Sequence, residues 1–367
     1  MENKFLLGRK ELLCVLINLF TVKMLFTYPR NMVILSGNAA WLQFIFVSLV
    51  FLLIYIISIF LYEKIGKINI IKACEKTGGK PLKIIVGLVI SIILFSNISV
   101  TTRAFPESIK IVLLPLTPIK IITLVFLIIS GIGAYVGVYS ISRIHALFIP
   151  IVGILMVLFA ILLIPYADIN NLFPVFGAGT QNIFLYGIES ISIFGDLIVL
   201  FILIPFFENF KMIKTSGRTA VIISGIVSTV IVLLYNLIYS YPASTEFLFP
   251  VYNMTRIIRI GDFFQRLEAF FEFIWSISIL LYSSIYIFAI CYLWKEIFDL
   301  KYYKQLIIPV TVIMGSLSFI PSSMADLLLI GEFVSKLSIP ISFLIPIVIS
   351  LIYRIKYKKL SSKKDSL

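Results

Sequence analysis

The sequence predicts an all-α integral membrane protein in which about ten transmembrane helices form two inverted halves of five. Three observations predict this class. The 367 residues are 60% hydrophobic and only 13% charged, whereas a soluble domain carries about 25% charged residues. Apolar runs long enough to cross a bilayer recur along the whole chain. Lys and Arg collect in every second connection between these runs.

The apolar runs, delimited by charges, prolines and glycines, give the expected spans in order. Each run is expected to be helical, because in lipid its backbone must satisfy its own polar groups. The first run follows Lys4, Arg9 and Lys10 and resembles a signal peptide, but no small-x-small cleavage site follows, so we expect it to stay as the first helix. The spans lie near residues 11–35, 41–62, 83–106, 118–138, 144–165, 184–206, 218–240, 268–294, 305–323 and 333–354.

Basic residues predict the orientation, because cytoplasmic connections carry the excess of Lys and Arg. With the N-terminus inside, the cytoplasmic segments collect Lys4, Arg9, Lys10, Lys64, Lys67, Lys72, Lys76, Lys80, Lys83, Arg143, Lys211, Lys214, Arg218, Lys295, Lys301, Lys304, Arg354, Lys356, Lys358, Lys359, Lys363 and Lys364. The other side receives only Lys110, Lys120, Arg256, Arg259, Arg266 and Lys336. We therefore expect both termini in the cytoplasm and interpret the basic tail as a topology anchor.

The connection 166–183 divides the spans into two sets of five, and because five is odd, the second set must insert upside down. Inverted repeats of this kind bind substrates near the midplane, where the first helix of each half is broken. Pro29 in span one and Gly195 in span six mark the two expected breaks. We expect one membrane domain over 1–367, made of repeats 11–165 and 184–354 and a tail 355–367.

Charged residues inside the predicted spans are candidate functional groups, because a charge at the bilayer centre costs roughly 2.5–3.5 kcal/mol and usually faces a cavity or a partner. Lys23 could bind a ligand carboxylate, occupy a cation position, or form a buried pair with Asp196. Asp196 could hold a ligand amine, shuttle a proton, or belong to that same pair. Arg103 is expected to stabilise an outer gate or to contact an anionic ligand, and Glu189 to lie near the outer interface.

The outer loop before span eight ends in the stretch Arg256 to Glu268, where charges alternate in sign at Arg259, Asp262, Arg266 and Glu268. This pattern is typical of a short amphipathic helix that would lie as a lid over the outer vestibule. A rigid packed loop is the alternative.

Several function classes are not expected. His145 is the only histidine, so no histidine-based metal cluster or Ser-His-Asp triad can form. Phosphate-binding and dinucleotide-binding motifs are missing, and we expect neither an enzyme nor a cofactor. Cys14, Cys74 and Cys291 lie far apart, which makes disulfides and zinc unexpected. The net charge of +13 comes from residues between spans, so nucleic-acid binding is not expected either.

One stretch after the fifth span carries a signature. Asp168 to Gly177 has the pattern D-x-x-N-L-x-P-V-x-G, which resembles that of B-subunits of endospore nutrient germination receptors. Further matches follow the family's order along essentially the whole chain. They are Tyr28-Pro29-Arg30, Thr102-Arg103, Phe194-Gly195, and Gly261 to Glu268 followed by Trp275.

This resemblance implies the five-plus-five inverted fold of the amino acid, polyamine and organocation transporter superfamily. It also implies a subunit that senses a small-molecule germinant in the spore inner membrane, together with an A-subunit membrane protein and a C-subunit lipoprotein. Many relatives carry small residues before the Pro-Arg of span one, whereas this chain has Thr21-Val22-Lys23-Met24. Lys23 is therefore expected to fill part of the pocket or to change the class of germinant.

We expect a small nutrient, of the amino acid class, to bind near the two breaks and to bias a conformational equilibrium that the partners read. The expected ligand-binding residues are Thr21, Lys23, Ser190, Gly195 and Asp196, and the expected break or gate residues are Tyr28, Pro29, Arg103 and Glu189. The alternative is a proton-coupled amino acid symporter in which Asp196 or Glu189 titrates. A third hypothesis is a scaffold that binds no ligand.

Overall fold

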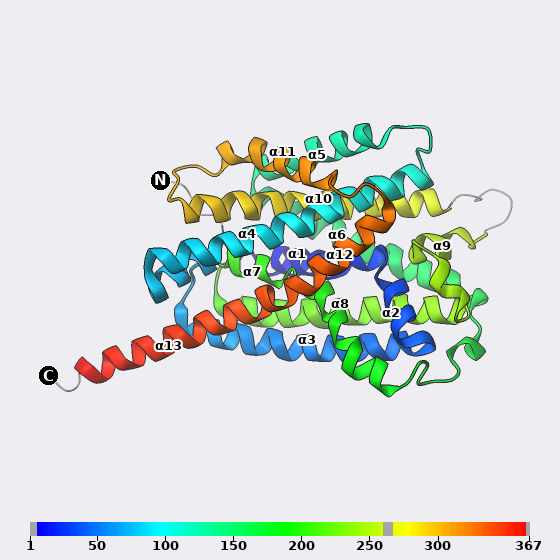
Figure 1. Ribbon diagram of the computed structural model, residues 1–367, viewed down its shortest axis with the longest axis horizontal. Helices are drawn as coiled ribbons and strands as arrows, with labels where there is room; N and C mark the ends of the chain where they lie inside the picture. Colours follow the sequence, from blue (N-terminus) through cyan, green and yellow to red (C-terminus); the bar gives the residue numbers. More distant parts are fainter. Residues whose placement is uncertain (1–5, 260–266, 365–367) are drawn as a thin grey trace.

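The computed structural model describes residues 6–259 and 267–364, with side chains through residue 356. Within these ranges the chain is helical apart from its turns, and the only β-bridge is an isolated one between Leu7 and Phe207. Most of the long helices follow the longest axis of the molecule, and the described residues begin and end toward the same end of it (Figure 1). Eight of the described helices are long and apolar enough to cross a membrane. This confirms the predicted all-α integral membrane class.

The first half of the chain forms the first five spans. Span one is divided into α1 (Arg9–Thr21), the 3₁₀ segment η1 (Val22–Leu25) and α2 (Tyr28–Ser36). The next four spans are α3 (Ala40–Tyr62), α4 (Ile70–Val112), α5 (Ile119–Val136) and α6 (Val138–Leu163). Helix α6 starts before the expected residue 144, because Ser140, Ser142 and Arg143 lower the hydropathy of its first turns without interrupting the helix.

The second half repeats this order. Span six is divided into η6 (Asn182–Tyr186), η7 (Gly187–Phe194) and α7 (Leu197–Leu203), and spans seven to nine are α8 (Phe210–Ile238), α10 (Leu267–Ile297) and α11 (Ile307–Ser318). The short α9 (Pro250–Arg256) lies between α8 and α10, and span ten comprises α12 (Met324–Ile339), η11 (Pro340–Leu344) and α13 (Ile345–Lys364).

Two helices of the second half begin earlier than their apolar runs, because polar caps extend them. The Asn209 side chain accepts a hydrogen bond from the Met212 N–H at the start of α8. Ser323 and Asp326 form a reciprocal capping box at the start of α12. Such caps satisfy N–H groups that have no partner within the helix. The predicted starts at 218 and 333 were therefore too late, and for α12 this moves two charged residues well inside a span.

The neighbours of each helix support the predicted inverted repeat. The second and seventh spans, α3 and α8, pack on each other, as do the third and eighth, α4 and α10. Helix α1 packs on α8 and α6, and the equivalent segment of the other half, η7, packs on α3 and α12. Likewise α5 packs on α10, whereas α11 packs on α4. Exchanging the halves thus leaves these pairs of neighbours unchanged, as a pseudo-two-fold relation requires.

The closest approach of α3 and α8 depends on a glycine. The Tyr55 hydroxyl donates a 2.8 Å hydrogen bond to the Ile213 carbonyl. A Cβ atom at Gly217 would lie only 1.6 Å from that hydroxyl oxygen. Any larger residue at 217 must therefore push α3 away or displace Tyr55.

We predict that Gly217→Val lowers the free energy of unfolding by about 1–3 kcal/mol, the usual cost of inserting atoms into a packed interior. The matched control is Gly153→Val on α6, where nothing lies within 4 Å of the added Cβ. Thermal unfolding of the detergent-purified protein, followed by tryptophan fluorescence, measures both. Equal unfolding temperatures for the two variants would contradict the proposed packing.

Candidate ligand cavity

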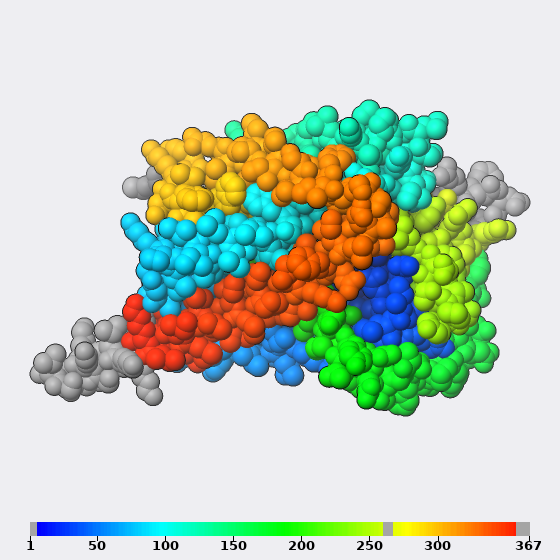
Figure 2. Space-filling model, viewed as in Figure 1, coloured from blue at the N-terminus to red at the C-terminus, as the bar shows by residue number. Residues whose placement is uncertain are grey.

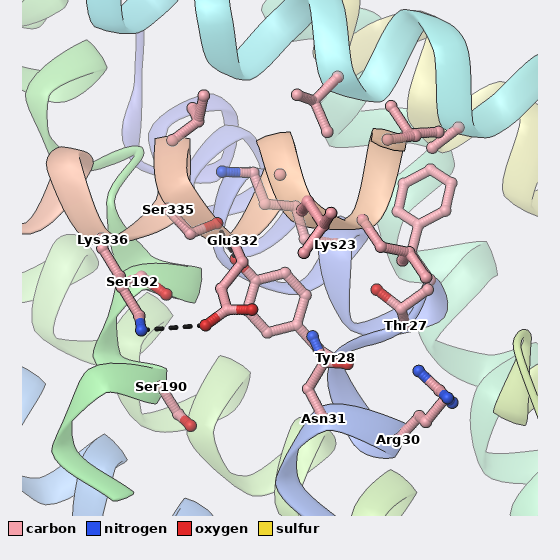
Figure 3. A pocket seen from close by; sticks show the side chains of 18 of the residues that line it. Lys23, Thr27, Tyr28, Arg30, Asn31, Ser190, Ser192, Glu332, Ser335 and Lys336 are labelled. Carbon is pink, nitrogen blue, oxygen red and sulfur yellow. Dashed lines mark hydrogen bonds and ion pairs between the residues drawn. The ribbon is translucent and has the colours of Figure 1, made fainter. Parts of the chain in front are cut away.

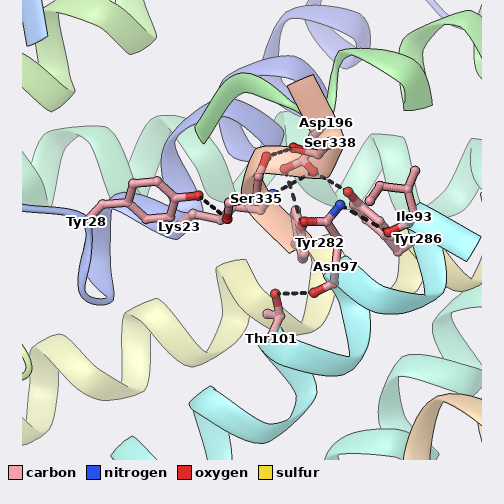
Figure 4. Close-up of polar contacts among 10 residues, drawn as sticks. All are labelled: Lys23, Tyr28, Ile93, Asn97, Thr101, Asp196, Tyr282, Tyr286, Ser335 and Ser338. Atoms are coloured by element: carbon pink, nitrogen blue, oxygen red, sulfur yellow. Dashed lines mark hydrogen bonds and ion pairs between the residues drawn. The ribbon is translucent and has the colours of Figure 1, made fainter. Parts of the chain in front are cut away.

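The two broken helices are joined by a buried ion pair. Lys23 lies in η1, and Asp196 follows Gly195 at the break of span six. The Lys23 Nζ lies 2.8 Å from Asp196 Oδ1, and the two side chains are 8% and 0% exposed (Figure 4). The sequence left several roles open for Lys23 and Asp196, and the structure shows that they form a buried ion pair.

Two tyrosines from α10 complete the surroundings of Asp196. The Tyr282 hydroxyl donates to Oδ2 at 3.2 Å, and the Tyr286 hydroxyl donates to Oδ1. The carboxylate therefore has three donors, and both of its oxygens are satisfied. A buried carboxylate needs such partners, because removal of a charge from water costs several kcal/mol unless it is paired and hydrogen-bonded.

A cavity of about 450 Å³ lies next to this pair. Cavities of roughly 300–1,000 Å³ are typical of small-molecule sites. Its walls come from α2, η7, the middle of α4 and α12, with Phe249 from the segment before α9. Lys23 lies in its lining, whereas Asp196 is fully buried behind Lys23.

The charged side chains that line the cavity are unevenly distributed over its walls (Figure 3). Lys336 lies 2.9 Å from Glu332 and 3.1 Å from Glu189, so two carboxylates share one ammonium group. On the facing α2, Arg30 donates from Nε to the Thr245 carbonyl at 2.6 Å, and no carboxylate pairs with it among the described residues. The cavity thus has an excess of positive charge at Arg30 and an excess of negative charge near α12.

Neutral groups connect the walls. The Tyr28 hydroxyl of α2 and the Ser335 hydroxyl of α12 are 3.2 Å apart. The Ser190 hydroxyl accepts a 2.7 Å hydrogen bond from Gln43 Nε2 of α3. Asn31 lines the cavity with an exposed side chain. These groups offer donors and acceptors to a polar ligand.

Several residues predicted for the site or its gate lie at the cavity. Lys23, Tyr28, Glu189 and Ser190 all line it. Gly195 does not, but its position is close-packed, since a Cβ there would lie 2.5 Å from Ser338 Oγ.

Other predicted residues lie elsewhere. The Thr21 hydroxyl donates to the Ile17 carbonyl of its own helix at 2.7 Å. Pro29 is buried in the first turn of α2, where its missing N–H costs nothing. Arg103 pairs with Glu107 at 2.9 Å and lies over the Phe319 ring. None of these three lines the cavity.

The expected lid helix falls mostly on residues 260–266, which include Arg266 and lie outside the described ranges. Glu268 is buried in the first turn of α10. The described helix in this region is α9, which packs on α10, α8 and η1.

Sequence reasoning missed Arg30, Asn31, Glu332, Ser335 and Lys336 as lining residues. A signal was available for the last three, because positions 332, 335 and 336 lie on one face of a helix. The helix start at 324, signalled by the Ser323 cap, would have brought Glu332 into span ten beside Ser335 and Lys336, which the predicted span 333–354 already contained.

The fold and this cavity define a permease-like membrane protein with two broken helices. The family model of spore germination proteins matches residues 10–326, and the chain belongs to this family. It is similar to spore germination protein A2 of Bacillus subtilis (strain 168), with 26% identity over 340 residues, 90% of this chain and 91% of the relative. Spore germination protein B2 of the same strain is 21% identical over 252 residues, 68% of each chain. Spore germination protein YndE is 26% identical over 268 residues, 71% of each chain.

We predict that Asp196→Asn destabilises the protein more than Lys23→Met does. Breaking a buried ion pair costs about 3–5 kcal/mol, but Asp196 keeps two tyrosine donors without Lys23, whereas Lys23 loses its carboxylate. The double variant removes both charges and should regain much of the loss. Unfolding temperatures of the three detergent-purified variants measure this cycle. Additive losses in the double variant would show that the two side chains do not interact.

Proposed function

We propose that this chain is the germinant-sensing subunit of a spore germination receptor and binds a small molecule of the amino acid class in the cavity beside the two helix breaks. The observation that carries the proposal is the charge arrangement of the cavity. Arg30 of α2, which has no carboxylate partner among the described residues, lines the same cavity as two carboxylates that share one ammonium group. Such a cavity suits a ligand with a carboxylate at one end and an ammonium group at the other.

Binding would act through the elements that form the walls. The cavity is bounded by the outer half of each broken helix, α2 and η7, and by α4 and α12. A ligand that contacts all four favours the conformation in which they lie closest together. It shifts the equilibrium only by the difference between its affinities for the two conformations. The Lys23–Asp196 pair keeps the two breaks together while the outer halves move.

Partner subunits would respond to this shift in the conformational equilibrium. We propose an A-subunit membrane protein and a C-subunit lipoprotein as these partners, in the spore inner membrane, with both termini of this chain on the core side. The described residues begin and end toward one end of the molecule, which supports this topology. The concentration of Lys and Arg in the connections at that end supports the orientation.

We predict that Asn31→Leu weakens the germination response, because an apolar side chain then replaces a polar one on the cavity wall. Spores carrying the variant are tested against a panel of amino acids, sugars and nucleosides, with receptor levels checked by immunoblot. The half-maximal concentration for one germinant class should rise about ten-fold, the equivalent of 1.4 kcal/mol. Gln181→Leu, an exposed position outside the cavity, is the control.

Unchanged dose-response curves in Asn31→Leu spores would contradict the cavity assignment. The symporter alternative is tested on the chain reconstituted alone in liposomes with a proton gradient. Accumulation of a labelled amino acid against its gradient would favour transport over sensing.

A further inference from the structure

The cavity is flanked by charged residues on the side of the helix bundle. Figure 2 shows part of α2 between α12, η6 with η7, and α9, on the long side of the molecule. Glu189, Glu332 and Lys336 line the cavity beside this part of α2, and their side chains are 57%, 60% and 50% exposed. We call these three residues the lateral charge cluster.

Two of these charges interrupt an apolar stripe. The exposed positions of α12 recur every three or four residues, as expected for the outer face of a helix. Leu329, Phe333 and Leu337 are exposed on this face, and Glu332 and Lys336 are exposed between them. On the neighbouring wall, Glu189 follows the exposed Leu185 by one turn. Large apolar side chains therefore surround the charges.

The charges also lie deep along their helix. Lys336 is about 18 Å from Met324, the first residue of α12, at 1.5 Å per residue, and the hydrocarbon layer is about 30 Å thick. Charged side chains at such depth normally face the protein interior, a water-filled cavity or another protein, because lipid exposure costs several kcal/mol.

We propose that the lateral charge cluster and the apolar stripe around it form the docking surface for a transmembrane helix of a partner subunit, and that this helix carries a basic side chain. The two carboxylates and one ammonium group leave a net charge of −1, which a Lys or Arg on the partner neutralises. Leu329, Phe333 and Leu337 provide the apolar contact above and below it. The inference rests on the proposed membership of a receptor complex, but not on the identity of the germinant.

Other occupants fit this surface less well. Lipid acyl chains offer no partner to the charges. A second copy of this chain, related by a two-fold axis, would bring the same negative clusters close together, and like charges across an interface oppose association. A partner helix with one basic side chain neutralises the charge, and its apolar side chains pack on the apolar residues around the cluster.

This surface also connects the cavity to the partner. Glu189, Glu332 and Lys336 line the cavity as well as its opening. A ligand ammonium group that binds the carboxylates competes with the partner's basic side chain for them. Ligand binding is thereby coupled to the contact with the partner, and such coupling acts equally in both directions.

A photo-crosslinking amino acid at Phe333 tests the docking surface in spores that carry the complete receptor. The expected product joins this chain to a membrane-embedded segment of a partner subunit that contains a Lys or Arg, as identified by mass spectrometry of the linked peptides. The control position is Ile154, which is 70% exposed and lies on α6, a helix that does not line the cavity. The yield at 333 should exceed that at 154 by about ten-fold, as expected for a specific interface against random encounters in the membrane.

A second variant tests the charge. Glu332→Gln should lower the amount of partner that co-purifies with this chain about ten-fold, because removing one member of a desolvated charge pair weakens association by that order or more. Glu246→Gln, at an exposed position of the outer loop, should leave it unchanged. A product joining two copies of this chain, products with lipid alone, or equal yields at 333 and 154 would each overturn the proposal.

The outcomes separate the docking surface from the sensor. A partner crosslink at 333 together with unchanged germination of Asn31→Leu spores would leave the interface standing and remove the ligand site. A changed dose-response without the crosslink would do the reverse.

Discussion

The ion pair between Lys23 and Asp196 is the interaction on which the centre of this protein depends. Each break leaves backbone groups without helical partners at mid-depth, where water is scarce. The pair joins the two breaks directly, across 173 positions of the chain, and Tyr282 and Tyr286 hold the carboxylate from α10. The two repeats therefore meet at a point that is chemically satisfied, and the outer halves α2 and η7 can form a cavity without destabilising the core.

The pair also explains why a lysine can stand before the Pro-Arg of span one. A lysine at position 23 brings a positive charge into the lining, and its charge is neutralised by an aspartate outside the lining. The cavity therefore gains an ammonium group without an adjacent exposed carboxylate. In the function proposed above, ligand selection falls to Arg30 on one wall and to the carboxylates of Glu189 and Glu332 on the other. Because Asp196 holds Lys23, the other charged residues of the lining remain to bind the proposed ligand.

Much of this fold could be predicted from the sequence, because hydropathy and basic residues act locally. The ten spans, the breaks near Pro29 and Gly195, and the lining position of Lys23 all follow from such signals. The choice between ion pair and ligand site for Lys23 could not be made, since it depends on a contact between distant segments. Tyr282 and Tyr286 were missed because they look like ordinary apolar positions of span eight. Only their spacing of four residues places both on one helix face.

The lateral charge cluster was missed for a different reason. Hydropathy averages over a window, so Glu332 fell just outside the predicted span 333–354, and Lys336, near the start of that span, was counted with the basic residues of the outer side. The cap at Ser323 shows that the helix begins at Met324, eight residues before Glu332. A charged residue that shortens a predicted span still lies inside the membrane when the helix continues past it. There the cost of exposing its charge to lipid requires a partner or water. Capping signals upstream of an apolar run therefore deserve equal weight with hydropathy in this class of protein, and here they lead directly to the proposed contact with the partner subunit.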